Sequence, residues 1–123
     1  MKKTNNSNVT DLTYLKQISN GDDHFIKEMI EVYIQQTPEA ISNLEKYLKN
    51  KDWKMVRSVT HKIKPSFSFF GLTDLSEIAN SIDEYCEKQI HLELLPDMIS
   101  KVKSTSAKAM IELEEQKKLS VII

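Results

Sequence analysis

The chain has 123 residues, 40% of them hydrophobic and 28% charged, a length and composition that suit one compact domain with a single core. Its formal net charge of -1 excludes a global positive field, so nothing in the charge balance indicates binding to nucleic acid or to a membrane surface. One cysteine, Cys86, excludes an internal disulfide, and no run of about 18 apolar residues indicates membrane spanning, so we expect a cytoplasmic protein.

The first predicted element is a short helix near the N-terminus. Residues 1–9 are mostly polar and are expected to form a flexible segment. Thr10 or Asp11 can then cap the helix, and the stretch "SNGDD" at residues 19–23 should end it. The side chains expected to face inward are Leu12, Leu15 and Ile18.

A long amphipathic stretch follows between residues 25 and 48. Apolar residues recur at helical spacing on both sides of Pro38. They are Phe25, Met29, Tyr33, Ile41, Leu44 and Leu48. Because a proline inside a helix removes one amide donor, we expect either a kink or a restart of the helix at Pro38.

The third predicted helix runs from Trp53 towards Phe70, with Asp52 as its cap and Gly71 just past its end. It contains Pro65, yet its apolar residues keep one stripe on both sides of this proline. The stripe consists of Val56, Val59, Ile63, Phe67 and Phe70. A break at the proline would turn the last two away from the core, so we expect the helix to continue with a bend.

Two further helices complete the pattern. Thr73 or Asp74 can cap the fourth, with Glu77 placed for a reciprocal capping pair, and Pro96 suits the first turn of the fifth. The apolar stripe of the fourth helix is Leu75, Ile78, Ala79, Ile82, Tyr85 and Cys86. That of the fifth is Met98, Ile99, Val102, Met110 and Leu113. Four such stripes with short connections predict an all-α fold: an antiparallel four-helix bundle with a short additional N-terminal helix, one domain over residues 1–123.

His61 lies opposite the apolar stripe of the third helix at about 100° per residue, and should therefore be exposed. Its neighbours at three-, four- and seven-residue spacing are Lys54, Arg57, Lys64, Pro65 and Ser68. Nearby positive charge disfavours protonation of an imidazole, so the ring should stay a neutral nucleophile. The same charges would stabilise an anion attached to it, a combination typical of a phosphoryl acceptor.

In this hypothesis His61 is the phosphoacceptor, and Lys64 or Arg57 reaches the phosphoryl oxygens, while Ser68 adds a hydrogen bond. The plainer interpretation is a solvated helix face that happens to contain a histidine. Phe69 falls off the core stripe, so it either packs against the fourth helix or belongs to an exposed apolar docking patch.

The segment "THKIKPSFSFFG" at residues 60–71 resembles the signature of histidine-containing phosphotransfer domains, the relay modules of two-component signalling. That signature reads roughly histidine, any residue, an aliphatic, lysine, glycine, a small residue and, several positions later, glycine. The matching residues are His61, Ile63, Lys64, Ser66 and Gly71. The helix pattern from Leu12 to Leu113 resembles the family's bundle as well.

The resemblance implies that His61 exchanges a phosphoryl group with the aspartate of response-regulator receiver domains, with a hybrid sensor histidine kinase as a further implied partner. It implies a phosphoryl carrier without autonomous kinase activity, cofactor or metal. The sequence departs from the signature at Pro65, which replaces a glycine, and at Phe67, which replaces a small residue. The implied docking surface comprises Lys54, Pro65, Ser68 and Phe69.

Two alternatives remain open at this stage. The first is a binding-only module on the same fold, in which Pro65 has changed the docking surface and the histidine no longer relays phosphate. The second is a structural bundle without chemistry. A metal site is not indicated, because His24 and His91 lack the three- or four-residue spacing of helical ligands.

Overall fold

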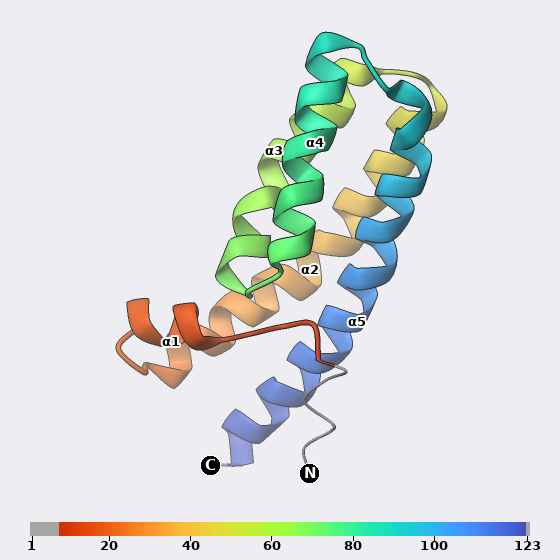
Figure 1. Ribbon diagram of the computed structural model, residues 1–123. Coiled ribbons are helices and arrows are strands. Elements are labelled where there is room, and N and C mark those ends of the chain that lie inside the picture. Colours follow the sequence, from red (N-terminus) through yellow and green to blue (C-terminus); the bar gives the residue numbers. More distant parts are fainter. Residues whose placement is uncertain (1–7, 123) are drawn as a thin grey trace.

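The computed structural model describes residues 8–122, which form helices joined by short connections. In chain order these are α1 (Thr13–Ile18), α2 (Asp23–Lys49), α3 (Trp53–Phe69), α4 (Thr73–Lys88), the 3-10 turn η2 (Leu92–Leu94) and α5 (Leu95–Ile122). Helices α2 to α5 run alternately up and down, and α1 lies beside the lower end of the bundle (Figure 1). The predicted all-α antiparallel four-helix bundle with a short additional N-terminal helix is therefore confirmed.

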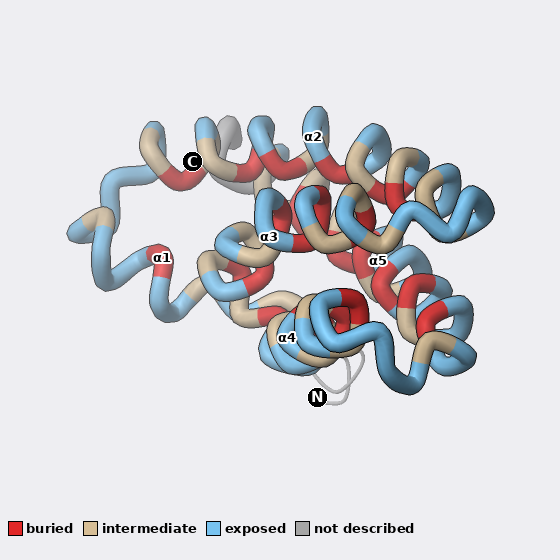
Figure 2. The backbone as a smooth tube through the Cα atoms, turned by 90° about the horizontal axis from the view of Figure 1, so that it is seen from above, coloured by how far each residue is buried: buried red, intermediate tan, exposed pale blue. Residues whose placement is uncertain are grey.

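One core runs along the centre of the bundle. Helix α3 packs against α2 and α4, and α5 packs against the same two helices. Each helix turns its buried residues towards this centre and its exposed residues outward (Figure 2). At the lower end of α3, the rings of Tyr33 and Phe70 meet edge to face with 5.2 Å between their centroids. The largest fully buried side chains include Ile30, Leu44, Phe67, Leu75, Ile82, Leu95, Ile99 and Leu113.

Both internal prolines lie inside uninterrupted helices. Of the two alternatives at Pro38, a restart is excluded, because α2 continues from Asp23 to Lys49. The expectation that α3 continues through Pro65 is confirmed. Both prolines are exposed, so the carbonyl groups left without an amide donor are on the outer, hydrated side of their helices.

Helix α3 ends where the sequence predicts, just before Gly71. Gly71 has a φ of +69° and directly follows the C-cap residue Phe70. The amide of Gly71 donates to the carbonyl of Ser68 at 3.3 Å, and the amide of Leu72 donates to Phe67 at 2.8 Å. This pair of bonds ends the helix with a left-handed residue, a position that suits glycine.

The predicted cap of α4 is wrong. The N-cap residue is Leu72, which makes no side-chain capping bond, so Thr73 and Asp74 already belong to the first turn and the reciprocal pair with Glu77 does not form. Leu72 is only 3% exposed. Burial of this side chain, with its amide bonded back to Phe67, fixes where α4 begins.

At the N-terminal end, α1 agrees only partly with the prediction. The N-cap residue is Leu12 and not the predicted Thr10 or Asp11, although the Asp11 side chain accepts a hydrogen bond from the amide of Thr13 at 2.9 Å. Leu15 is fully buried, as predicted. Ile18, expected to face inward, is 48% exposed, because the six-residue helix contacts the bundle through little more than one turn before the chain reverses at 19–21. The expected flexible segment falls largely on residues 1–7, which lie outside the described residues.

Two other predicted helix ends agree with the structure. The Asp52 side chain accepts a hydrogen bond from the amide of Met55 at 3.2 Å and so caps α3. Helix α5 begins at Leu95, which places Pro96 in its first turn. Across the described residues, none of the helices is both long and apolar enough to span a membrane.

Candidate functional site

His61 lies on the outward face of α3, as predicted. Its side chain is 61% exposed, while Val59 and Ile63, two residues before and after it, are buried in the core. Because α3 is a single helix across Pro65, the alternation of core and surface holds on both sides of the histidine. The imidazole is therefore open to a partner molecule.

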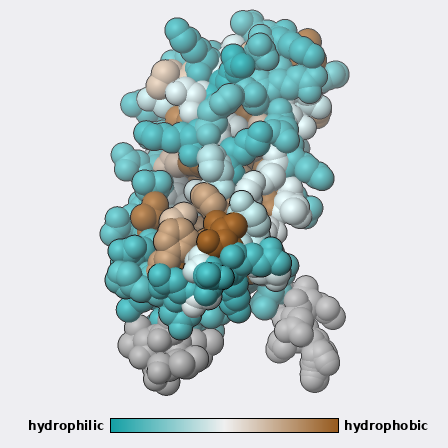
Figure 3. Space-filling view, turned by 90° about the vertical axis from the view of Figure 1, so that its left-hand side faces the viewer, coloured by the Kyte–Doolittle hydropathy of each residue, from teal (hydrophilic) through white to brown (hydrophobic). Residues whose placement is uncertain are grey.

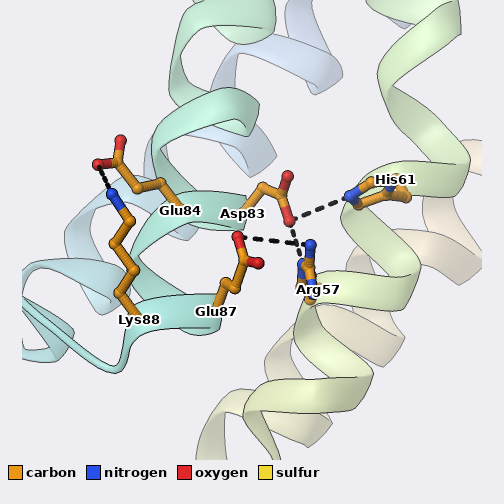
Figure 4. A network of polar contacts seen from close by, with 6 residues as sticks. All are labelled: Arg57, His61, Asp83, Glu84, Glu87 and Lys88. Carbon is orange, nitrogen blue, oxygen red and sulfur yellow. Dashed lines mark hydrogen bonds and ion pairs between the residues drawn. The ribbon is translucent and has the colours of Figure 1, made fainter.

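A carboxylate from the neighbouring helix, which the sequence analysis missed, faces His61. Asp83 of α4 places its Oδ1 atom 3.0 Å from Nε2 of His61 (Figure 4). The Nε of Arg57 donates to the same oxygen, and Nη2 of Arg57 lies 3.5 Å from Oε1 of Glu87. His61 and Arg57 on α3 thus face Asp83 and Glu87 on α4.

The charges in this cluster stabilise one another. Partial burial raises the pKa of Asp83, but hydrogen bonds and charge from Arg57 and His61 lower it, and the balance holds it below its ordinary value. The hydrogen bond to Asp83 raises the pKa of the Arg57 guanidinium. Asp83 is accordingly ionised at neutral pH, and Arg57 is bound between two carboxylates.

This arrangement corrects one expectation. His61 is not surrounded by cations alone, because a carboxylate lies closest to its ring and the cation predicted to help it, Arg57, is paired with Asp83 and Glu87. One available signal is the four-residue spacing of these two acidic residues, which places both on one face of α4. That spacing alone does not reveal which residues of α3 they meet.

The remaining predicted residues lie on α3 around His61. Lys64 is half-buried one turn after it, and among the described residues it forms no ion pair. Pro65 and Ser68 are exposed, as is Lys54 one turn before Arg57. The predicted exposure therefore holds for Lys54, Pro65 and Ser68, whereas Lys64 is partly covered.

Phe69 was expected either to pack against the fourth helix or to belong to an exposed apolar patch, and its position matches neither alternative fully. It is half-buried against the core and stacks on Tyr14 of α1, with 6.2 Å between the ring centroids. Tyr14 is 49% exposed, and Ile18 nearby in the same short helix is also exposed. Apolar surface gathers on this side of the molecule towards its lower end (Figure 3). We call Tyr14, Ile18 and Phe69 the apolar patch.

Within the described residues, no group of three or more histidine, cysteine or carboxylate side chains is arranged to hold a metal ion. The cluster places an exposed imidazole beside one cation and two carboxylates. The fold and site together define a class of domain: an antiparallel helical bundle that presents a histidine on the outer face of one helix.

The chain belongs to the Hpt domain family, whose profile matches residues 28–116, including His61 and the facing part of α4. It is 30% identical over 91 residues to the phosphorelay intermediate protein YPD1 of Candida albicans, covering 72% of this chain and 50% of the relative. It is 32% identical over 72 residues to multistep phosphorelay regulator 1 of Schizosaccharomyces pombe, covering 58% of this chain and 24% of the relative. The chain thus spans half or less of the length of these curated relatives.

Solved structures share the fold at low sequence identity. The histidine-containing phosphotransfer protein HptB of Pseudomonas aeruginosa PAO1 aligns with a TM-score of 0.81 and 16% identity, covering 91% of this chain and 96% of its own. The HPT domain of an Hpt sensor hybrid histidine kinase from Shewanella aligns with a TM-score of 0.79 and 15% identity, covering 90% and 95%. The resemblance to the phosphotransfer family is therefore confirmed in both sequence and fold.

Proposed function

We propose that this protein is a phosphoryl carrier in a multistep phosphorelay, and that His61 is its phosphoacceptor. His61 takes the group from the aspartyl phosphate of one receiver domain and passes it to the aspartate of another. The observation that carries the proposal is the exposed imidazole on α3, within the segment that matches the Hpt profile. The names of the relatives, a phosphorelay intermediate and a multistep phosphorelay regulator, support the same role.

The transfer step is a nucleophilic substitution at phosphorus. Nε2 of His61, the ring nitrogen at the outer tip of the side chain, forms the new N–P bond with its free lone pair, and the O–P bond of the acyl phosphate breaks with its electron pair going to the receiver's carboxylate. Nδ1 holds the ring proton while this bond forms. Because the phosphoryl group arrives already activated on the partner, the chain needs no nucleotide and acts without kinase activity of its own.

Two cations on α3 are assigned electrostatic roles in this step. Lys64, one turn after His61 and free of ion pairs among the described residues, supplies a charge-assisted hydrogen bond to the phosphoryl oxygens. Arg57 is already paired with Asp83 and Glu87, so it contributes less than Lys64 while these pairs persist. Ser68 and Lys54, exposed on the same helix, border the site and contact the approaching partner.

The docking surface is proposed to extend from His61 over Pro65 to the apolar patch. The patch combines exposed aromatic and aliphatic side chains with a stacked pair of rings, features of a protein-binding surface. The proposed partners are receiver domains, including that of a hybrid sensor histidine kinase. A partner on this surface would cover both the nucleophile and the apolar side chains.

A binding-only module is the second candidate function, and Asp83 is the observation that favours it. A carboxylate 3.0 Å from Nε2 occupies one side of the imidazole and opposes the arrival of another anion. In that case the apolar patch would bind receiver domains while His61 stayed unmodified.

The experiment that separates the two functions uses a phosphorylated receiver domain. The chain and its His61→Gln variant are incubated with it, and label on the chain is tested for loss in acid and persistence in base. Acid-labile label on the parent and none on the variant is expected. Binding of the receiver without such label would favour the binding-only module, and label that survives in His61→Gln would disprove the assigned acceptor.

A further inference from the structure

We infer that Asp83 opposes the phosphorylation of His61 and so shifts the phosphoryl equilibrium towards the receiver domain. This inference rests on the proposed function of His61, and it assigns to Asp83 an effect on how readily His61 is phosphorylated. Three consequences of the position of Asp83 act in the same direction: it selects a tautomer of the ring, it occupies the space beside Nε2, and it withholds a cation.

The tautomer follows from the hydrogen bond. Asp83 is ionised and can only accept, so at 3.0 Å the proton between it and His61 belongs to Nε2 of the ring. A neutral imidazole with its proton on Nε2 has no free lone pair on that nitrogen. Before Nε2 can attack phosphorus, the proton has to move to Nδ1, and the hydrogen bond to Asp83 is lost.

Asp83 also occupies the position that a phosphoryl group on Nε2 would need. A substituent on Nε2 lies in the plane of the ring where the proton lay, and that direction faces Oδ1 of Asp83 (Figure 4). A phosphoryl group with its oxygens cannot fit into a gap of hydrogen-bond length. The group would also carry negative charge against an ionised carboxylate, a like-charge contact that disfavours the phosphorylated state.

The third consequence concerns Arg57. Its guanidinium donates to Asp83 and lies 3.5 Å from Glu87, one turn further along α4. While it remains there, its charge is largely offset by these two carboxylates, so it stabilises phosphoryl oxygens less than an unpaired cation would. Phosphorylation therefore requires the His61 side chain to turn away from α4 or Asp83 to release both of its partners.

The test is the variant Asp83→Asn, which keeps the size of the side chain and removes its charge. Equal amounts of chain and phosphorylated receiver are mixed, and the label on each is measured at equilibrium. The ratio of labelled chain to labelled receiver should rise at least about tenfold, equivalent to about 1.4 kcal/mol. A ratio equal to or below that of the parent would overturn the inference.

A matched control lies on the same helix. Glu84 is exposed, pairs with Lys88 and faces away from His61, so Glu84→Gln removes one negative charge without touching the cluster (Figure 4). Its ratio should equal the parent's. A rise in Glu84→Gln as large as that in Asp83→Asn would attribute the effect to net charge and contradict a specific role of Asp83.

A small phosphoryl donor tests the inference without a receiver domain. Phosphoramidate transfers its phosphoryl group to imidazoles with loss of ammonia and needs no docking. Asp83→Asn should be labelled on His61 faster than the parent, and an unchanged or lower rate would overturn the inference. Faster labelling by phosphoramidate together with no labelling by any phosphorylated receiver would refute the proposed relay function while leaving the role of Asp83 intact.

Discussion

At the scale of single residues, the two cations beside His61 differ in what they can do. Arg57 is held by two carboxylates of α4, whereas Lys64 forms no ion pair among the described residues. A cation that is already paired gives little to a new anion unless the first pair breaks. If His61 is phosphorylated as proposed, we therefore expect the stabilisation of the phosphoryl group to depend more on Lys64 than on Arg57.

Replacing Lys64 by alanine should slow transfer to His61, or shorten the lifetime of the phosphorylated state, by roughly tenfold or more. The reason is the loss of a charge-assisted hydrogen bond, a contribution of about 1.5–3 kcal/mol. Transfer kinetics with a phosphorylated receiver provide the measurement. Lys62→Ala is the control, since Lys62 lines a pocket between α2 and α3 together with Gln36 and Asn43. Equal kinetics for both variants and the parent would exclude a role for Lys64.

Cys86 gives a second prediction at this scale. Burial, reinforced by the nearby Asp83 carboxylate, raises the pKa of its thiol to about 11. Because only the thiolate reacts, the folded protein should resist a thiol reagent at pH 8, and the labelling rate should rise steeply with urea as the bundle opens. Rapid labelling of the native chain, at the rate of a free cysteine, would show that Cys86 is not packed in the core as described.

At the scale of the element, α3 contains a proline in its interior at a usual cost of about 3 kcal/mol. Phe67 and Phe70 follow the proline and are fully buried, and each contributes about 1.5–3 kcal/mol by burial. Stopping the helix at Lys64 would remove both rings from the core. The continued helix therefore has the lower free energy, and Pro65 remains on its exposed side, one turn beyond His61.

Pro65 should tolerate a smaller residue and resist a larger one. Pro65→Gly leaves the surface beside His61 open and is expected to retain transfer, whereas Pro65→Phe should obstruct the approach of a receiver. Receiver affinity measured by titration should fall for Pro65→Phe and stay close to the parent's for Pro65→Gly. Undiminished binding by Pro65→Phe would place the docking surface elsewhere on the bundle.

The turn after α3 offers a comparison between the two glycines. Both have positive φ, +77° at Gly21 and +69° at Gly71, so an alanine at either is strained by about 1–2 kcal/mol. A Cβ at position 71 would also lie 2.7 Å from Cβ and O of Asp11, while at position 21 no atom lies within 4 Å. Gly71→Ala should therefore lower the free energy of unfolding clearly more than Gly21→Ala. Equal losses in urea unfolding would contradict the close approach of the N-terminal segment.

At the scale of the whole molecule, the sequence predicts what depends on one helix and fails where two helices must be placed relative to each other. Periodicity gives the bundle and the exposed His61, because each helix carries its own apolar stripe. The contact of Asp83 with His61 depends on the register between α3 and α4, which neither stripe encodes. The prediction of where α4 begins is wrong for a similar reason, because burial of Leu72 outweighs the capping preferences of Thr73 and Asp74.

The attachment of residues 9–11, which hold α1 against the bundle, could not be predicted from the sequence either. The amides of Val9 and Thr10 donate to the two carboxylate oxygens of Glu112 at 2.7 and 2.9 Å, and the Thr10 hydroxyl donates at 2.6 Å. The amide of Asp11 donates to the carbonyl of Phe70. The bonds to Glu112 join residues 102 or 103 positions apart. Together with the Asp11 bond they lead the chain from α5 to the end of α3, directly before the apolar patch.

Glu112→Ala should therefore weaken receiver docking from a distance. Without the carboxylate, the amides of Val9 and Thr10 lose their acceptor. Helix α1 then keeps the burial of Leu15, the bond from Asp11 to Phe70 and the stacking of Tyr14 on Phe69, but loses its attachment to α5. Hydrogen exchange of these two amides should accelerate, helix content should stay near the parent's, and affinity for a receiver should fall because Tyr14 and Ile18 are less firmly placed. Glu115→Ala, an exposed carboxylate on the same helix, is the control and should change none of these quantities. Faster exchange with unchanged affinity would show that α1 is no part of the docking surface, and unchanged exchange would show that Glu112 does not hold the segment.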